Sequence, residues 1–191
     1  MKNPLQLGHP GVLAALGAAV LFGGGTPLAK LLLGNVNPWM LASLFYLGSG
    51  CGLWLYRRWR NAAPVAMPAN EQPWLAGAIV SGGVVGPVLL MYGLTHMSAA
   101  SASLMLNAES VFTALIAWIA FKENVDRRIA LGMLAIVAGA LILSWPGNAD
   151  FSGAVPALAV LGACLAWGLD NNLTRRVSLN DAAWLASVKG L

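Results

Sequence analysis

The sequence predicts an all-α polytopic membrane protein, built from a first repeat of five helices and the start of an inverted second repeat. Hydrophobic residues make up 58% of the 191 residues and charged residues only 9%, too few charges to cover the surface of a soluble globule. The mean hydropathy is +0.70. The apolar residues gather in long runs divided by short polar loops, and the chain aligns with itself without a gap.

This self-alignment separates residues 1–145, the predicted first repeat, from residues 153–191, a predicted incomplete second repeat. Five long apolar runs precede the second copy, and an odd number of membrane crossings turns that copy upside down. Inverted repeats with a site at their interface are typical of secondary transporters. The coinciding residues include Gly8 with Gly153, Leu16 with Leu161, Gly17 with Gly162, Gly23 with Gly168, Leu28 with Leu173, Lys30 with Arg175, and Trp39 with Trp184.

Six apolar runs approach or reach the roughly 20 residues that cross about 30 Å of hydrocarbon. Their glycines and prolines are tolerated in membrane helices. The first run is longer than the roughly 7 to 15 residues of a signal-peptide core, so we expect it to be retained as a span. In chain order the runs are Gly11 to Leu33, Trp39 to Tyr56, Trp74 to Leu94, Ala99 to Phe121, Ile129 to Trp145, and Ala154 to Thr174.

A seventh run begins near Ala183 and ends with the chain at Leu191. At about 1.5 Å per residue, this run reaches less than halfway across a bilayer. We therefore expect the second repeat to be C-terminally truncated, with helix six complete and helix seven only begun.

The cations predict the orientation, because short loops rich in Lys and Arg stay in the cytoplasm. The loops after the second, fourth and sixth runs carry the cations, which places the N-terminus inside, in a bacterial cytoplasmic membrane. Tryptophans near the ends of the runs match an interfacial aromatic belt. The cations are Arg57, Arg58, Arg60, Lys122, Arg127, Arg128, Arg175 and Arg176, and the tryptophans are 39, 54, 59, 74, 118 and 145.

Glu109 lies near the middle of the fourth run, where a carboxylate costs on the order of 3 kcal/mol to insert. On a helical wheel it shares one side with Ser103, Asn107, Ser110 and Thr113, while large apolar residues occupy the other side. Ionisable residues inside a membrane are candidates for proton or substrate sites. The alternative is a protonated or paired Glu109 that holds helices together.

A second candidate region comes from the repeat. The run from Gly23 to Pro27, which includes Thr26, is expected to loosen helical hydrogen bonding, and its counterpart contains Asp170 and Asn171. Irregular or polar segments at equivalent positions of two halves indicate a transporter site, although a simple packing kink is the alternative. Asp170 is also expected at the same depth as Lys189 on the next helix, which favours a structural ion pair over a substrate role.

The segment from Asn107 to Trp145, NAESVFTALIAWIAFKENVDRRIALGMLAIVAGALILSW, resembles part of an EamA-type transporter of the drug/metabolite transporter superfamily. Residues 153–176, GAVPALAVLGACLAWGLDNNLTRR, resemble the opening of that family's second repeat. The resemblance implies a ten-helix fold when complete, both termini in the cytoplasm, and transport of small metabolites or drugs. Glu123 occupies a position that recurs in the family. We expect it to be structural and to pair with Arg127.

These observations predict a secondary transporter, expected to export small molecules by alternating access. The alternative is a non-transporting membrane scaffold, an assembly subunit or an inactive fragment. We expect no enzymatic activity, no catalytic residues, no cofactor and no metal site, because His9 and His96 lack neighbours at ligand spacing. Cys51 and Cys164 are expected to be small core residues. The expected partners are the lipid bilayer and a small-molecule substrate, but no nucleic acid. The sequence leaves open whether the protein forms a homodimer.

Overall fold

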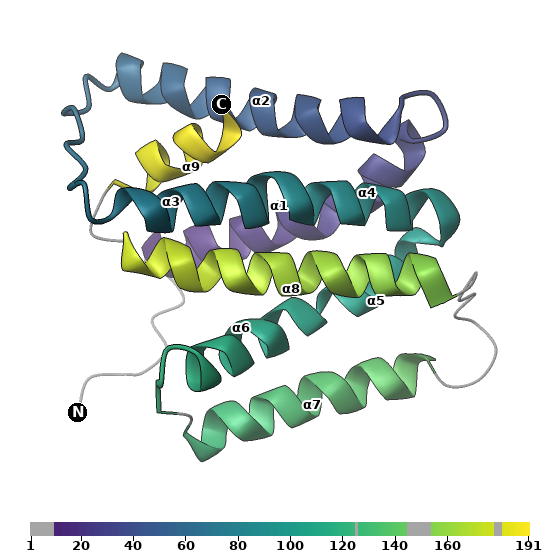
Figure 1. Ribbon diagram of the computed structural model, residues 1–191. Helices are drawn as coiled ribbons and strands as arrows, with labels where there is room; N and C mark the ends of the chain where they lie inside the picture. The colour runs from purple at the N-terminus through teal and green to yellow at the C-terminus, as the bar shows by residue number, and fades with distance from the viewer. Residues whose placement is uncertain (1–9, 125, 145–153, 178–180) are drawn as a thin grey trace.

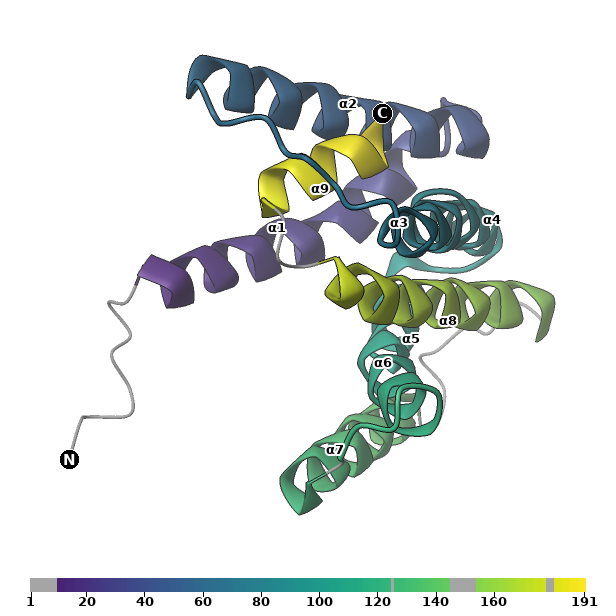
Figure 2. The ribbon, with the colours of Figure 1, turned by 60° about the vertical axis from the view of Figure 1, so that its left-hand side comes forward.

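The computed structural model describes residues 10–124, 126–144, 154–177 and 181–191, and the regular elements in these ranges are all helices. The helices lie side by side (Figure 1). The chain is therefore an all-α protein with the architecture of a polytopic membrane protein. The described elements are α1 (Pro10–Leu32), α2 (Pro38–Trp59), α3 (Gln72–Ala78), a π-helical segment (Ile79–Val85), α4 (Gly86–His96), α5 (Ala99–Leu106), α6 (Ala108–Ile119), α7 (Arg127–Ser144), α8 (Ala154–Arg176) and α9 (Ala182–Gly190). Among them, α3 and α4 cross α2 and α8 at an angle (Figure 2).

Four stretches of the described residues are long and apolar enough to cross a bilayer. They correspond to the first, third, fourth and sixth predicted runs. The helices of the second and fifth runs, α2 and α7, have 22 and 18 residues, and their membrane crossing stays a prediction. The four stretches are Gly11–Leu32, Gln72–His96, Ala99–Ile119 and Ala154–Arg176.

The looser hydrogen bonding expected between Gly23 and Pro27 does not interrupt the first span, which is a continuous helix. A proline inside a helix removes one backbone donor, yet α1 continues through Pro27 to Leu32. Large apolar side chains cover most of its surface, including Val20 and Leu21, which are 75% and 79% exposed. Such a surface matches a helix that faces lipid, where tertiary packing is not needed to keep apolar side chains from water.

The irregular backbone lies instead in the third and fourth spans. In the third, the backbone N–H of Gly86 bonds the carbonyl of Ser81, five residues back, and the π-helical segment joins α3 to α4. This shift releases the carbonyl of Gly82, which accepts hydrogen bonds from the hydroxyl of Tyr46 at 2.6 Å and the indole N–H of Trp167 at 3.0 Å. The π-helical segment is thereby fixed to α2 and α8.

The fourth span breaks at Asn107, between α5 and α6, where a single helix was expected. The Asn107 side-chain amide donates to the carbonyls of Leu104 and Ser103, at 3.0 and 3.3 Å. Asparagine side chains compete with the helical backbone in this way and favour helix ends. The break puts Glu109 in the first turn of α6, where the positive end of a helix dipole favours a carboxylate.

The core is organised around α8, which packs against α4 on one side and α6 on the other. Its buried residues Val160, Ala163 and Cys164 share a cluster with Leu94 of α4 and Ala102 of α5. The expectation of a core position is therefore confirmed for Cys164 but wrong for Cys51, which is exposed on α2. In contrast to α8, α1 and α7 extend along the outside of the bundle (Figure 2).

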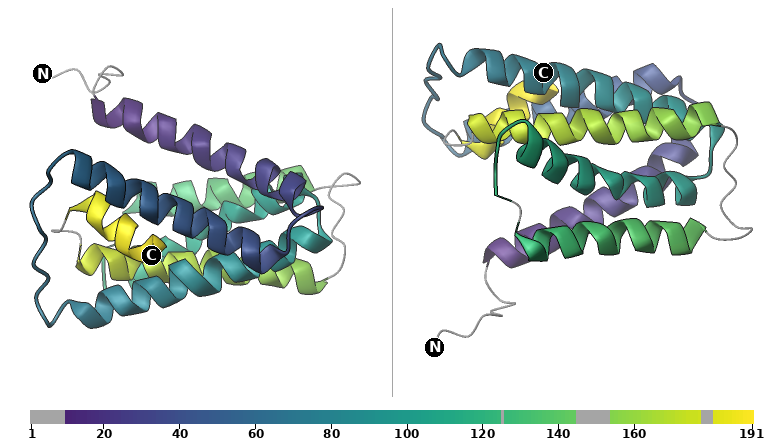
Figure 3. Two further views of the ribbon diagram at one scale, coloured as in Figure 1. Left: turned by 90° about the horizontal axis from the view of Figure 1, so that it is seen from above. Right: turned by 60° about the horizontal axis from the view of Figure 1, so that its bottom comes forward.

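The two stretches that align in sequence run in opposite directions: α1 and α8 are antiparallel, as are α2 and α9 (Figures 1 and 3). Opposite directions are what an inverted second repeat requires. The repeat itself stays a prediction, because only its first helix and the short α9 belong to the second copy.

The contact between α2 and α9 depends on two glycines. A Cβ atom added at Gly50 would lie 2.6 Å from the backbone carbonyl carbon of Gly190, whereas one added at Gly52 would meet nothing within 4 Å. Glycine is common at helix interfaces in membranes because it lets two backbones approach closely. The short α9 is held on α2 by this approach and by the hydroxyl of Ser187, which donates to the carbonyl of Gly50 at 3.2 Å.

We therefore expect Gly50→Ala to destabilise the protein and Gly52→Ala, on the same helix, to leave its stability unchanged or slightly higher. Overpacking of a tight contact typically costs about 1 to 3 kcal/mol. Thermal unfolding in detergent, followed by size-exclusion fluorescence, measures both variants. Equal melting temperatures would contradict the packing of α9 against α2.

Candidate functional site

A cavity of about 470 Å³ lies between α1 and the broken fourth span. It gathers three of the four polar side chains that the wheel placed with Glu109, all except Thr113, and it adds Thr26 from the first span. Apolar residues of α1 complete the opposite wall. The lining residues are Ala19, Phe22, Gly23, Thr26, Ser103, Leu106, Asn107, Glu109 and Ser110.

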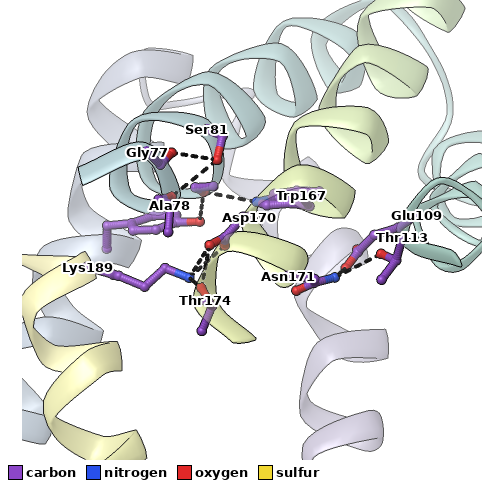
Figure 4. Close-up of polar contacts among 12 residues, drawn as sticks. Gly77, Ala78, Ser81, Glu109, Thr113, Trp167, Asp170, Asn171, Thr174 and Lys189 are labelled. Carbon is purple, nitrogen blue, oxygen red and sulfur yellow. Dashed lines mark hydrogen bonds and ion pairs between the residues drawn. The ribbon is translucent and has the colours of Figure 1, made fainter. Parts of the chain in front are cut away.

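Glu109 also contacts α8. The side-chain amide of Asn171 donates to the Glu109 carboxylate at 2.9 Å and to the Thr113 hydroxyl at 3.2 Å (Figure 4). The neighbouring Asn172 donates to the backbone carbonyl of Thr113 at 3.0 Å. Two consecutive asparagines of α8 thus hold the turn of α6 that carries Glu109.

The charge of Glu109 has no cationic partner among the described residues, where the ion pairs involve Asp181, Glu123 and Asp170. A carboxylate at mid-span is costly unless it is protonated, paired or close to water. Glu109 has instead an amide donor on one side and a polar cavity on the other. A group in this setting can take up and release a proton, or contact a polar substrate.

The predicted repeat relates the two helices that flank Glu109. The alignment that pairs Lys30 with Arg175 also pairs Thr26 with Asn171. Thr26, which is only 6% exposed, lines the cavity from α1, and Asn171 reaches the carboxylate from α8. Equivalent positions of the two copies thus lie on either side of one acidic side chain.

Asp170 occupies a different place from its neighbour Asn171. Its carboxylate contacts the Lys189 ammonium at 2.5 and 2.6 Å, and the Thr174 hydroxyl donates to it at 2.8 Å (Figure 4). Asp170 is 7% exposed and does not line the cavity. Neighbouring residues on a helix point about 100° apart, so α8 turns Asp170 toward α9 and Asn171 toward α6.

The surroundings of Asp170 were not predicted in the sequence analysis. A Cβ atom added at Gly82 would lie 2.0 Å from the Asp170 carboxylate, so the π-helical segment packs directly against this side chain. The carbonyl of Gly82 binds Tyr46 and Trp167 in the same place. Gly82 stands in a Gly-Gly pair before Gly86-Pro87, a pattern that marks irregular helix.

Two basic side chains contact opposite ends of the bundle. The ammonium of Lys30, near the end of α1, donates to the backbone carbonyl of Leu94, near the end of α4. The guanidinium of Arg175, near the end of α8, pairs with Glu123 after α6. The expected pairing of Glu123 with Arg127 is therefore wrong, because the chain brings α8 against the end of α6.

The metal and cofactor expectations stay predictions. The described residues contain no group of three or more His, Cys, Asp or Glu side chains that could hold a metal ion. His96 lies beside Thr95 and Tyr92 at the end of α4, and His9 lies outside the described residues.

Comparison with known proteins decides the family. The pattern of the EamA-like transporter family matches residues 9–145. The chain belongs to the EamA-like transporter family. It is 26% identical over 198 residues to an "Uncharacterized transporter" of Methanothermobacter thermautotrophicus, a match that covers 94% of this chain and 57% of the archaeal protein. The chain thus spans little more than half the length of that relative.

A second relative of this EamA-like protein comes from Pseudomonas fluorescens and is named "Probable 4-amino-4-deoxy-L-arabinose-phosphoundecaprenol flippase subunit ArnE". The two are 32% identical over 111 residues, which is 53% of this chain and 96% of the relative. No solved structure matches the chain. Family membership and the apolar helices agree with the multi-pass membrane protein that the composition predicted.

We expect Asp170→Asn, and separately Lys189→Met, to destabilise the protein by about 3 to 5 kcal/mol, because each leaves one buried polar group without its partner. The double variant is expected to recover much of this loss. Melting in detergent is the measurement, with Asp126→Asn, an exposed position before α7, as the control. Additive losses in the double variant would show that the two side chains do not stabilise the fold as a pair.

Proposed function

We propose that this chain forms part of a secondary transporter that moves small metabolites or drugs across the cytoplasmic membrane by alternating access, in the direction of export. The N-terminus lies in the cytoplasm in this proposal. The observation that carries it is the Glu109 carboxylate, which has no cationic partner among the described residues and faces a polar cavity at mid-span. Alternating access around a midplane site is the general mechanism of such carriers.

Glu109 is the proton-coupling or substrate-binding group in this mechanism. When ionised, the carboxylate accepts the hydrogen bond from Asn171 and draws α8 to α6. When protonated, the carboxyl group loses its charge and the charge-assisted part of that bond, which is the stronger part. Proton uptake would therefore loosen α6 from α8, and it would lower the cost of exposing the group to lipid during the conformational change. Ser103, Asn107, Ser110 and Thr26 supply donors and acceptors for a polar solute in the cavity.

The contacts of Lys30 and Arg175, at the two ends of the bundle, provide the two gates of the proposed transport path. Lys30 and Arg175 occupy equivalent repeat positions, and the antiparallel course of α1 and α8 puts them at opposite ends of the bundle (Figure 1). Breaking the contact of Lys30 with Leu94 would open one end of the cavity wall, and breaking that of Arg175 with Glu123 would open the other. Both contacts are formed in this structure, and in the proposed cycle they would break in turn.

A second candidate function is a subunit of a larger membrane assembly, with a lipid-linked solute as substrate or without transport of its own. The Pseudomonas relative favours it, because its name is that of a flippase subunit and the match covers 96% of it. A partner, either a second copy or a related subunit, would then complete the transport path. The partner would bind the exposed apolar sides of α1 or α7 (Figure 2).

We expect Glu109→Gln to abolish proton-driven transport by the full-length protein. Proteoliposomes are given a panel of labelled amino acids, nucleosides and cationic dyes, with and without a proton gradient. The wild type should accumulate at least one solute when the gradient is present, and Glu109→Gln should lose that dependence because glutamine cannot carry the proton.

Asp126→Asn, which neutralises an exposed carboxylate before α7 and keeps a capping side chain, is the matched control and should transport normally. Unchanged gradient-driven flux in Glu109→Gln would remove the proposed role of Glu109. Transport that requires a co-purified partner would favour the subunit function.

A further inference from the structure

A second cavity, of about 720 Å³, lies at the cation-rich end of α2, away from Glu109. Its wall combines two guanidinium groups with two indole rings. It is formed by the last turns of α2, the following loop and the start of α9. The lining residues are Trp54, Arg57, Arg58, Asn61, Ala62, Pro64, Val65 and Trp184.

The shape of this cavity is set by the end of α2. Asn61 adopts the left-handed conformation, with φ of 48°, as asparagine often does after a helix. The backbone N–H groups of Asn61 and Ala62 then bond the carbonyls of Arg58 and Arg57, at 3.2 and 3.0 Å. These bonds satisfy carbonyls whose partial negative charge would otherwise oppose an anion.

Arg57 joins the two walls. Its guanidinium donates to the carbonyl of Ala63 at 2.8 Å and pairs with Asp181, the residue that caps α9. The backbone N–H of Trp184 and the guanidinium of Arg57 hold the pKa of Asp181 below its usual range, so this carboxylate is ionised at neutral pH. The charge of Arg57 is therefore already compensated.

Arg58 is different. Its side chain is exposed and has no hydrogen bond or ion pair with the part of the chain that the structure describes. Once Asp181 is counted as the partner of Arg57, the cavity has one uncompensated positive charge, that of Arg58. Trp54 lies four residues earlier on the same side of α2 and is 51% exposed, while Trp184 lines the cavity from α9.

This combination fits the surface of a membrane. Indole rings gather at the level of lipid headgroups, and basic pockets between membrane helices on the cation-rich side bind anionic headgroups. A soluble anion would use the guanidinium but would leave the two indole rings exposed to water. A phospholipid uses both, because its phosphate meets the cation and its glycerol and upper acyl chain cover the rings.

We propose that this cavity binds the headgroup of an anionic phospholipid, with Arg58 as the residue that contacts the phosphate. Trp54 and Trp184 pack against the glycerol region, and the amide of Asn61 is available to the headgroup hydroxyls. The bound lipid would bridge α2 and α9, which meet in this structure through Gly50, Gly190, Ser187 and the pair of Arg57 with Asp181.

Native mass spectrometry of the full-length protein tests this proposal with phosphatidylglycerol and phosphatidylcholine as probes. The wild type should retain phosphatidylglycerol in preference to phosphatidylcholine. Arg58→Gln should lower that retention about fivefold, the effect of one basic residue near a membrane surface, and Arg58→Lys should keep most of it. Arg128→Gln, which removes an exposed cation elsewhere, is the matched control and should change nothing.

Arg58 is exposed at the end of its helix, so the variants are expected to melt at the wild-type temperature, which confirms that they fold. An equal loss in Arg58→Gln and Arg128→Gln would overturn the proposal, because it would reflect the overall charge of the surface. Displacement of phosphatidylglycerol by inorganic phosphate would overturn it too, since the cavity would then be a site for a free anion.

Discussion

A carboxylate inside a membrane protein must be paired, hydrogen-bonded or protonated, and both acidic side chains within this bundle meet that requirement through α8. Asp170 belongs to α8 and is held by Lys189 of α9. Glu109 belongs to α6 and receives the amide of Asn171 from α8. Because the two α8 residues are neighbours, one helix connects a compensated charge on one side with an uncompensated charge on the other. Both contacts, that of Asp170 with Lys189 and that of Asn171 with Glu109, require the position of α8 between α4 and α6.

The irregular backbone serves these two contacts. The π-helical segment brings Gly82 against Asp170 and turns its carbonyl toward Tyr46 and Trp167. The break at Asn107 begins a new helix at Ala108, one residue before Glu109. Segments of this kind persist at membrane depth where protein or a cavity surrounds them, and π-helical turns are frequent at functional sites. The third span is therefore irregular where it packs against Asp170, and the fourth span is irregular just before its own Glu109.

Much of this arrangement could be predicted from the sequence. Hydropathy and length identified the helical runs, because a bilayer demands long apolar segments. The cost of a carboxylate at mid-span singled out Glu109, and the wheel placed Ser103, Asn107 and Ser110 on its side. The opposite charges of Asp170 and Lys189, at matching depth on successive helices, suggested their contact.

The remainder depended on tertiary packing. A Gly-Gly-Gly-Thr-Pro run predicted looser hydrogen bonding in α1, but that helix is continuous, whereas Asn107 ends α5 through a local side-chain bond that periodicity does not reveal. Glu123 pairs with Arg175 rather than with Arg127, because local spacing carries no information about which helix end lies nearby. The links between α8 and its neighbours, such as Asn171 with Glu109, likewise join residues far apart in sequence and needed the fold.

The contact between Glu109 and Asn171 is the central claim, and a double-mutant cycle on thermal stability tests it most directly. Glu109→Gln, Asn171→Leu and the double variant are compared with the wild type of the full-length protein in detergent at neutral pH. Residues that interact directly are expected to show a coupling energy of about 0.5 to 3 kcal/mol. Strictly additive changes would contradict the account, because α6 and α8 would then meet without help from this bond.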